Sequence, residues 1–463
     1  MGRSHWIVAA SLLAVLAAPA LAADAPPGEA LPPPPGAPAT PPVEPGSVKG
    51  LQPVAPPPPT DSTMIVPTQN ERILTSARSF TGIPEYITPM YDPQGRYLIP
   101  WTGQHMWRDR WWTVFAAETI TYDTNIFLSE DDEEDDWISN TSVGVTLRRQ
   151  CGGWAALATV AATYSAYLEH DEENFLGANA IIDVGYNQGC GWYFGASDRF
   201  SYSDDPIIVR DDQFVVLEQE REDYIINDLE LRAGYHTPKW NAEVRYDIET
   251  YIGLDEVNEH YDYWAHGLRG RFDYYLSECF SLGAFAGVRY FDYTENELYD
   301  DPWIYEGGAT FSWRPRAKFG VVGAVGYTWS EDGETNESIL TDIGVIWDAT
   351  ARTTFAAGWN HSFQPTFGAE SEITDLIYLR GTHTIAPFWV FTVSTGLQMG
   401  DVQDPTLNST KDYDLWFFDA FIHRNIGCHW GIDFGYQYRT QRADENGIDY
   451  TDHRITLGAS FTL

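Results

Sequence analysis

Charged side chains recur at every second residue in three successive segments, and once more at Arg289. In an extended strand, residues two apart point to the same side, so each segment presents its charges together. Arginines and carboxylates at similar depth on neighbouring strands produce a local field that orients a polar or ionic solute. The alternative is that these charges only pair with each other and with water. The set comprises Glu230, Arg232, Glu243, Arg245, Asp247, Arg269, Arg271, Asp273 and Arg289.

Other alternating segments carry small, neutral residues on the corresponding side. One segment reads Thr392, Ser394, Gly396 and Gln398, and another contains Gly320, Ala324 and Gly326. If these segments are strands of the same sheet, the charges are concentrated on one wall and the remaining lining is neutral.

Catalytic motifs have little support in this chain. It contains no Gly-x-Ser-x-Gly elbow, no phosphate-binding loop and no metal-ligand pair of histidines. His361 beside Ser362 offers a weak hydrolase arrangement, and the acidic run Asp131–Asp136 lacks the spaced ligands of a calcium loop. We therefore expect no enzymatic activity, no cofactor and no metal site.

The elements that carry these residues are predicted to be β-strands. Between Trp240 and Ile252, apolar and polar residues alternate strictly, which is the period of a strand rather than a helix. Eight short turns and nine longer, mostly acidic connections alternate along residues 111–463. Seventeen connections join eighteen strands. An even number of strands with short and long connections in turn is typical of a transmembrane antiparallel β-barrel in the outer membrane.

Aromatic residues follow most of the short turns. Such rings favour the headgroup region of a bilayer, so they predict a periplasmic girdle. A second girdle near the long loops is expected from Phe127, Tyr251, Tyr293 and Trp329. A soluble β-helix or sandwich also alternates, but it explains neither this placement nor the alternation of loop lengths. The periplasmic girdle comprises Trp154, Trp192, Trp240, Trp389 and Trp430.

Four cysteines fall in the predicted short turns, and these lie in an oxidising compartment. Cys151 and Cys190 stand in neighbouring turns, about 10 Å apart by strand spacing. That exceeds the usual reach of a disulfide, so the turns must lean together for a bond to form. We treat Cys151–Cys190 as a possible pair and assign no mate to Cys279 or Cys428.

The first 110 residues differ in composition from the rest. Residues 1–22 have the basic start, apolar stretch and small-residue cleavage site of a signal peptide. Residues 23–60 are rich in proline and favour a disordered, extended linker, either a passive spacer or a contact to the cell wall. Residues 61–110 fit neither pattern and are expected to form a periplasmic segment or a plug.

The first predicted hairpin carries a family resemblance. Tyr122-Asp123-Thr124-Asn125-Ile126-Phe127 precedes an acidic loop, and Trp137-Ile138 open the return strand. This hairpin resembles the start of β-barrel porins of the kind found near exopolysaccharide gene clusters in Gram-negative bacteria. The resemblance implies a porin-like barrel and offers polysaccharide export as one alternative role.

The composition and the last strand indicate which classes of partner to expect. A formal net charge of -39 makes nucleic acid an improbable partner, and 15% aromatic residues exclude a disordered acidic protein. In the last strand, the apolar residues at every second position from Ile455 to Leu463 form one face. This pattern resembles the C-terminal strand that the barrel-assembly machinery recognises, although Leu replaces the usual terminal Phe. The sequence predicts a barrel embedded in outer-membrane lipid for passive diffusion of small hydrophilic solutes. The alternatives are a structural or surface barrel without an open pore, and polysaccharide export.

Overall fold

The computed structural model describes eighteen ranges of the chain. Residues 1–110, which hold the predicted signal peptide, linker and plug, lie outside them. The ranges are 111–129, 133–151, 153–186, 191–203, 207–210, 213–216, 223–254, 262–277, 279–293, 301–316, 318–331, 336–350, 352–365, 371–386, 389–404, 409–427, 429–443 and 449–463.

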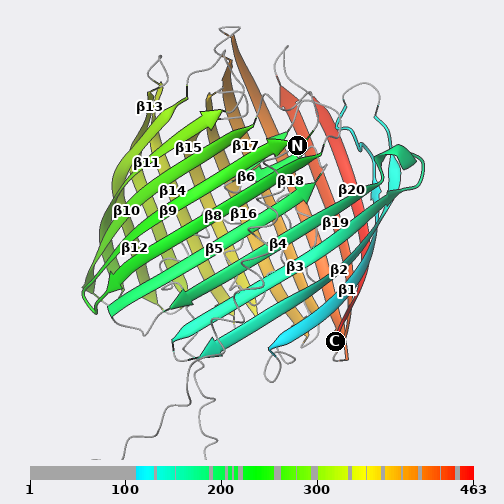
Figure 1. The fold of residues 1–463 in the computed structure, drawn as a ribbon, viewed down its shortest axis with the longest axis horizontal. Coiled ribbons are helices and arrows are strands. Elements are labelled where there is room, and N and C mark those ends of the chain that lie inside the picture. Colours follow the sequence, from blue (N-terminus) through cyan, green and yellow to red (C-terminus); the bar gives the residue numbers. More distant parts are fainter. Residues whose placement is uncertain are drawn as a thin grey trace, which may run out of the picture. The chain divides into compact units, whose positions relative to one another are not determined.

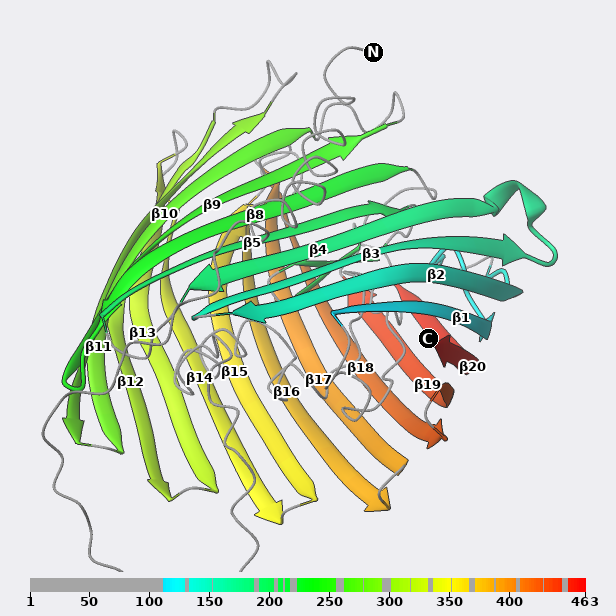
Figure 2. The same cartoon turned by 60° about the horizontal axis from the view of Figure 1, so that its bottom comes forward.

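Eighteen antiparallel strands form one closed sheet, as the sequence predicts (Figures 1 and 2). Each strand pairs with the next along the chain, and the sheet closes where β1 pairs with β20, from Phe115↔Thr462 to Asp123↔Arg454. Closure leaves no unpaired strand edge. The strands are β1 (Trp112–Asp123), β2 (Asp136–Cys151), β3 (Trp154–Tyr167), β4 (Phe175–Tyr186), β5 (Gly191–Ser203), β8 (Tyr224–His236), β9 (Trp240–Gly253), β10 (Tyr263–Ser277), β11 (Phe280–Tyr293), β12 (Trp303–Arg316), β13 (Phe319–Glu331), β14 (Asn336–Thr350), β15 (Thr353–Pro365), β16 (Ser371–Ala386), β17 (Trp389–Asp404), β18 (Ser409–Ile426), β19 (Trp430–Ala443) and β20 (Tyr450–Thr462).

The connections at one end of the barrel are the predicted short turns, whereas those at the other end vary in length. All eight predicted short turns join the strands expected, and Gly153 and Gly427 within two of them have positive φ, a conformation that glycine adopts without strain. Among the nine predicted long connections, those after β13, β15 and β17 are short because the strands extend further than expected. The connection after β5 contains a separate hairpin, β6 (Ile207–Arg210) paired with β7 (Gln213–Val216). A 3-10 turn, η1 (Asp171–Glu173), lies between β3 and β4.

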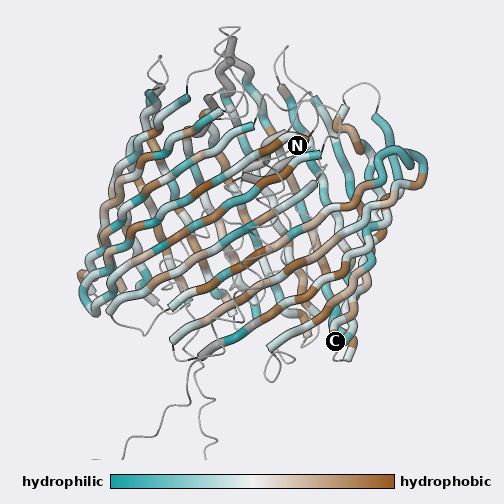
Figure 3. The backbone as a smooth tube through the Cα atoms, viewed as in Figure 1, coloured by the Kyte–Doolittle hydropathy of each residue, from teal (hydrophilic) through white to brown (hydrophobic). Residues whose placement is uncertain are grey.

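Side chains alternate between the two faces of the sheet. On β20, Ile455 and Leu457 are exposed while Asp452 and Arg454 are buried. The same two-residue alternation of apolar and polar colour runs along most strands in Figure 3. The exposed apolar face is the outside of the barrel, and the face with buried polar and charged residues is the inside. No helix formed by the described residues is long and apolar enough to cross a membrane.

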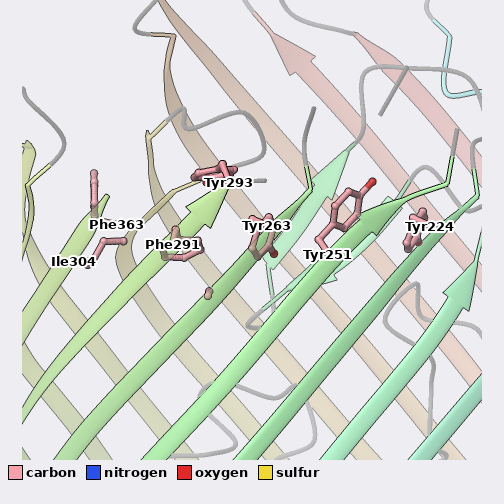
Figure 4. Packing of buried hydrophobic residues seen from close by; sticks show 8 residues of the cluster. Tyr224, Tyr251, Tyr263, Phe291, Tyr293, Ile304 and Phe363 are labelled. Carbon is pink, nitrogen blue, oxygen red and sulfur yellow. The ribbon is translucent and has the colours of Figure 1, made fainter. Parts of the chain in front are cut away.

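A row of aromatic side chains lies on the inner face near the ends of β8 to β11 that lead into the long connections (Figure 4). Tyr224 stacks on Tyr251, and Tyr251 stacks on Tyr263, with ring centroids 5.7 and 6.0 Å apart. The row continues to Phe291 and Tyr293. The prediction that Tyr251 and Tyr293 belong to an outer girdle is therefore wrong. Their parity along the strand puts them on the same side as Glu249 and Arg289.

Candidate functional site: the charged inner wall

The predicted charged residues come together on the inner face of β8 to β11. Strand register places Arg232, Arg245 and Arg269 side by side at one level. Adjacent strands lie about 4.8 Å apart, so three neighbouring guanidinium groups need counter-charges. Those counter-charges are present on the same and adjacent strands.

Four arginines in this wall form ion pairs with other described residues. Arg245 pairs with Glu243 and lies 3.7 Å from Glu230. Arg269 pairs with Glu306 on β12, which the sequence analysis did not select. Three further ion pairs extend the network at other levels of the wall. Arg271 lies 2.7 Å from Asp273, and Arg289 lies 3.3 Å from Asp247 and 2.5 Å from Glu249.

Glycines let some of these side chains lie flat along the wall. Arg232 extends over Gly195 on β5, and Asp247 extends over Gly267 on β10, so a Cβ at either glycine would clash with the charged group. Both charged groups therefore project less into the lumen, and Asp247 remains 3.3 Å from Arg289. This geometry explains how ion pairing and partial exposure coexist.

The nine predicted residues differ in exposure. The side chains of Glu230, Asp247, Arg269 and Arg289 keep between 26% and 33% of their accessible surface. Glu243 and Asp273 are buried instead. Glu243 accepts a hydrogen bond from Tyr193 Oη at 2.8 Å, and Asp273 accepts one from Thr310 Oγ1 at 3.1 Å. These two carboxylates hold the wall together, whereas the other four groups keep part of their surface accessible.

A second charged wall, which the sequence analysis missed, covers β18 to β20 and β1. Arg454 lies 2.9 Å from Asp123 and 2.8 Å from Asp452. Asp419 accepts hydrogen bonds from Ser394 Oγ at 3.2 Å and Gln437 Nε2 at 3.3 Å. The expectation of one charged wall and a neutral remainder is therefore incomplete, although Ser394 and its neutral neighbours on β17 do face inward. The two-residue spacing of Asp452 and Arg454 was the available signal.

The loop after β1 folds against this second wall. We call residues 124–129 the strap. Asn125 Nδ2 donates to Ser129 O at 2.8 Å and to Thr451 O at 3.2 Å, and Ser129 N donates back to Asn125 Oδ1 at 2.9 Å. The backbone is further joined to β20 by Thr124 N donating to His453 O at 3.1 Å. These bonds tie the start of the strap to β20 and tie its end, Ser129, back to Asn125.

Leu128 anchors the strap on the inner face. It is buried in a cluster with Leu376, Leu415, Phe417 and Tyr450, which belong to β16, β18 and β20. Its φ of 54° is strained for a residue with a Cβ, at a cost of about 1–2 kcal/mol. Burial of a leucine side chain contributes about 1.5–3 kcal/mol and offsets that strain. The strap thus occupies part of the barrel mouth.

His170 fastens the base of the strap. Its Nε2 lies 2.6 Å from Glu134 and its Nδ1 lies 3.1 Å from Asp136, and Phe127 contacts the ring edge to face. Burial disfavours the charged imidazole, but the hydrogen bonds and negative charges of Asp136 and Glu134 outweigh it and raise the pKa of His170. A carboxylate pair around a raised-pKa histidine makes this loop contact pH-dependent.

The five predicted girdle tryptophans lie at the strand ends beside the short turns. Trp154, Trp192 and Trp430 are exposed on the outer face. Trp240 is half-buried between Tyr235 and Phe272, with centroids 5.5 and 6.0 Å away. Arg424 lies over the Trp389 ring at 4.8 Å. Trp313 and Trp347 are exposed at the same ends, and the sequence analysis overlooked them.

Little in the described residues supports other chemistry. Ser362 and His361 are successive residues of β15, so they point to opposite faces, and His361 pairs with Asp375 at 3.0 Å instead. The described ranges contain no group of three or more His, Cys, Asp or Glu side chains that could hold a metal ion. Cys279 is free and exposed. The side chains of Cys151 and Cys190 lie outside the described residues, so their pairing stays a prediction.

No protein-family model matches the chain, and no curated protein sequence matches it significantly. Solved structures of similar architecture include the outer membrane protein OpdK from Pseudomonas aeruginosa, with 10% identity over 76% of this chain and 99% of that chain and a TM-score of 0.42. OccK2 (OpdF) from the same organism, in complex with glucuronate, has 11% identity over 77% and 98% of the two chains and a TM-score of 0.43. The FrpB iron transporter from Neisseria meningitidis has 11% identity over 73% and 62% and a TM-score of 0.41. The strand pairing of this chain, rather than these likenesses, establishes its barrel.

Proposed function

We propose that this chain is an outer-membrane channel through which small polar or ionic solutes diffuse passively. The observation that carries the proposal is the closed eighteen-stranded sheet, apolar on its outer face and charged on its inner face. A β-sheet satisfies every backbone hydrogen bond in lipid only when it is closed. Eighteen strands enclose a lumen wide enough to hold water.

The charged wall supplies the selectivity in this proposal. Arg269, Arg289, Glu230 and Asp247 offer partly exposed charges of both signs at neighbouring levels. A charged solute that passes along the wall exchanges part of its hydration for these groups, and their separation orients its dipole. Binding remains weak because each group already has a partner, and weak binding allows the solute to leave.

Purified full-length protein in a planar lipid bilayer tests the proposal. We expect stepwise ion conductance from protein whose folded state is verified by heat-modifiable electrophoretic mobility. Folded protein that inserts but never conducts would reject an open channel.

The strap is proposed to narrow the channel, and it has its own test. Leu128→Asp places a charge in the apolar cluster with Leu415 and Phe417, which releases the strap from the inner wall. Single-channel conductance should rise. Leu168→Asp is the matched control because Leu168 is an exposed loop residue beside the same hairpin. Equal conductance for both variants and the parent would show that the strap does not limit the pathway.

A sealed barrel with a structural or surface role is the second candidate. The favouring observation is the near-complete burial of inner-face residues such as Phe291, Gln398 and Leu415. An open, water-filled lumen leaves inner residues more exposed. Deletion of residues 61–110 separates the candidates: conductance that appears only after the deletion supports a plugged barrel, while equal conductance before and after it supports the open channel.

A further inference from the structure

Two oppositely charged side chains, Asp183 on β4 and Arg199 on β5, face the lumen at the edge of the first charged wall. The two strands lie side by side in Figure 2, and their register has no bulge, so side chains alternate between the faces along the whole pair. On β4, Leu176 is exposed on the outer face, which puts the odd-numbered Asp183 inside. On β5, Trp192 is exposed on the outer face, which puts the odd-numbered Arg199 inside.

These two side chains are more accessible than the charges of the first wall. Both are exposed, whereas the most accessible ion-paired groups of the first wall keep 26% to 33% of their side-chain surface. At all other inward positions of the described strands, an exposed side chain occurs only at a strand end beside a short turn. The inner face therefore presents Asp183 and Arg199 directly to whatever enters the barrel.

Neither charge is neutralised by a neighbouring side chain. Among the residues that the structure describes, the Asp183 carboxylate and the Arg199 guanidinium form no ion pair and no side-chain hydrogen bond. Asp228 on β8 stands opposite Arg199, and the two form no ion pair within the described ranges. The four paired arginines of the first wall differ in this respect. A solute can bind Asp183 and Arg199 without first displacing a protein partner.

The spacing of the two charges fits a solute that carries both signs. Asp183 pairs with Ser197 across the strands and Arg199 pairs with Ile181, so the two charged residues are diagonal neighbours. Diagonal neighbours on one face lie about 7–8 Å apart. An ammonium and a carboxylate group joined through one carbon, with a charge-assisted hydrogen bond at each end, span about 8 Å. One such solute can therefore contact both residues at once.

We infer that Asp183 and Arg199 form a subsite for zwitterionic solutes, with the ammonium group at Asp183 and the carboxylate group at Arg199. A solute with a single charge is attracted by one of these residues and repelled by the other, so the subsite discriminates against simple ions. The inference rests on the proposed passage of solutes through the lumen and names their chemical class. α-Amino acids with uncharged side chains are small members of that class.

Equilibrium binding to the full-length protein, folded in detergent, tests the subsite without requiring an open channel. Saturation-transfer NMR compares three probes: L-alanine, propionate, which lacks the ammonium group, and ethylammonium, which lacks the carboxylate group. We expect L-alanine to bind at least about threefold more tightly than either single-charge probe. Asp183→Asn and Arg199→Gln each remove one contact, so each should weaken L-alanine binding about three- to tenfold.

A matched control and an exchange variant separate charge recognition from a structural role. Arg352→Gln removes an exposed guanidinium group at the short turn between β14 and β15, and it should leave L-alanine binding unchanged. The double variant Asp183→Arg with Arg199→Asp keeps both signs and exchanges their places. L-Alanine can bind this variant in the opposite direction, so we expect its affinity to recover to within about threefold of the parent. Heat-modifiable mobility verifies that each variant is folded.

Three results would overturn the inference. The first is equal affinity of the parent for all three probes, and the second is a loss in Arg352→Gln as large as that in Arg199→Gln. The third is an exchange variant that binds L-alanine no better than the single variants do. Conductance in the planar bilayer is scored separately. Binding of L-alanine without conductance would reject the channel and keep the subsite, whereas conductance without this binding would do the reverse.

Discussion

The two charged inner walls use the same residue types and differ in how completely they are enclosed. On β8 to β12, four of the charged groups keep about a quarter to a third of their side-chain surface. On β20 and β1, Asp123 and Asp452 are 1% exposed and bracket Arg454. In the proposed channel, the first wall is the one that a solute would contact. The second wall closes the barrel and supports the strap, because its ion pairs join the first strand to the last.

The second wall should therefore be the more costly to break. Arg454→Met removes the arginine that pairs with the buried carboxylates of Asp123 and Asp452, and we expect a loss of about 3–5 kcal/mol. Arg289→Met removes a more exposed pair and should cost less, near 1 kcal/mol. Urea unfolding followed by electrophoretic mobility measures both. Equal losses would remove the distinction between a structural and a solute-facing wall.

The first wall should dominate ion selectivity. Arg269→Glu combined with Arg289→Glu reverses two partly exposed inner-face charges, and the reversal potential in a salt gradient should shift toward cations. The matched control is Arg149→Glu, because Arg149 is exposed near the short-turn end of β2 and follows the outward parity of Leu147. An unchanged reversal potential in the double variant would show that these arginines do not face the ion pathway.

Sequence alternation predicted the strand count and the first wall for a local reason. A period of two is a property of each strand alone, so Glu243, Arg245 and Asp247 are assigned to one face without knowing their neighbours. The same rule assigns Tyr251 to that face. The girdle prediction for Tyr251 failed because it followed residue type, and tyrosine suits both a membrane interface and a wet inner wall.

The second wall and the strap depend on contacts that no local pattern contains. Asp123 and Arg454 are separated by most of the barrel sequence and meet only when β1 closes against β20. In the sequence, Leu128 is an ordinary loop residue. Only the fold shows that its backbone has a φ of 54° and that its side chain packs in the cluster on β16 and β18. The motif Tyr122–Phe127 marked the hairpin, but the packing of its last four residues as part of the strap follows from the fold.

A pH change should loosen the strap and leave the first wall unaffected. The folded-state pKa of His170 is raised above about 6.5, its usual value, so its stabilisation is complete below that pH and is lost as pH rises through the raised pKa. Protease cleavage within the strap hairpin should be faster at about pH 9 than at about pH 5.5. His170→Gln should remove most of this dependence, and equal cleavage at both pH values in the parent would contradict the assignment.

The smallest effect on stability is expected from substitution of a glycine in or beside the first wall. The size of that effect depends on whether the added Cβ meets a side chain that can move or a backbone atom that cannot. At Gly195, an added Cβ meets the side chain of Arg232, which can swing into the lumen. Gly195→Ala should therefore cost under about 1 kcal/mol and shift selectivity slightly toward anions, since one guanidinium moves off the wall. At Gly308, an added Cβ meets the backbone carbonyl of Val325, which cannot move without distorting β13. Gly308→Ala should destabilise the barrel more and leave selectivity unchanged. If Gly195→Ala instead unfolds the barrel as readily as Gly308→Ala, then Arg232 is fixed as firmly as Arg454, and the first wall is structural throughout.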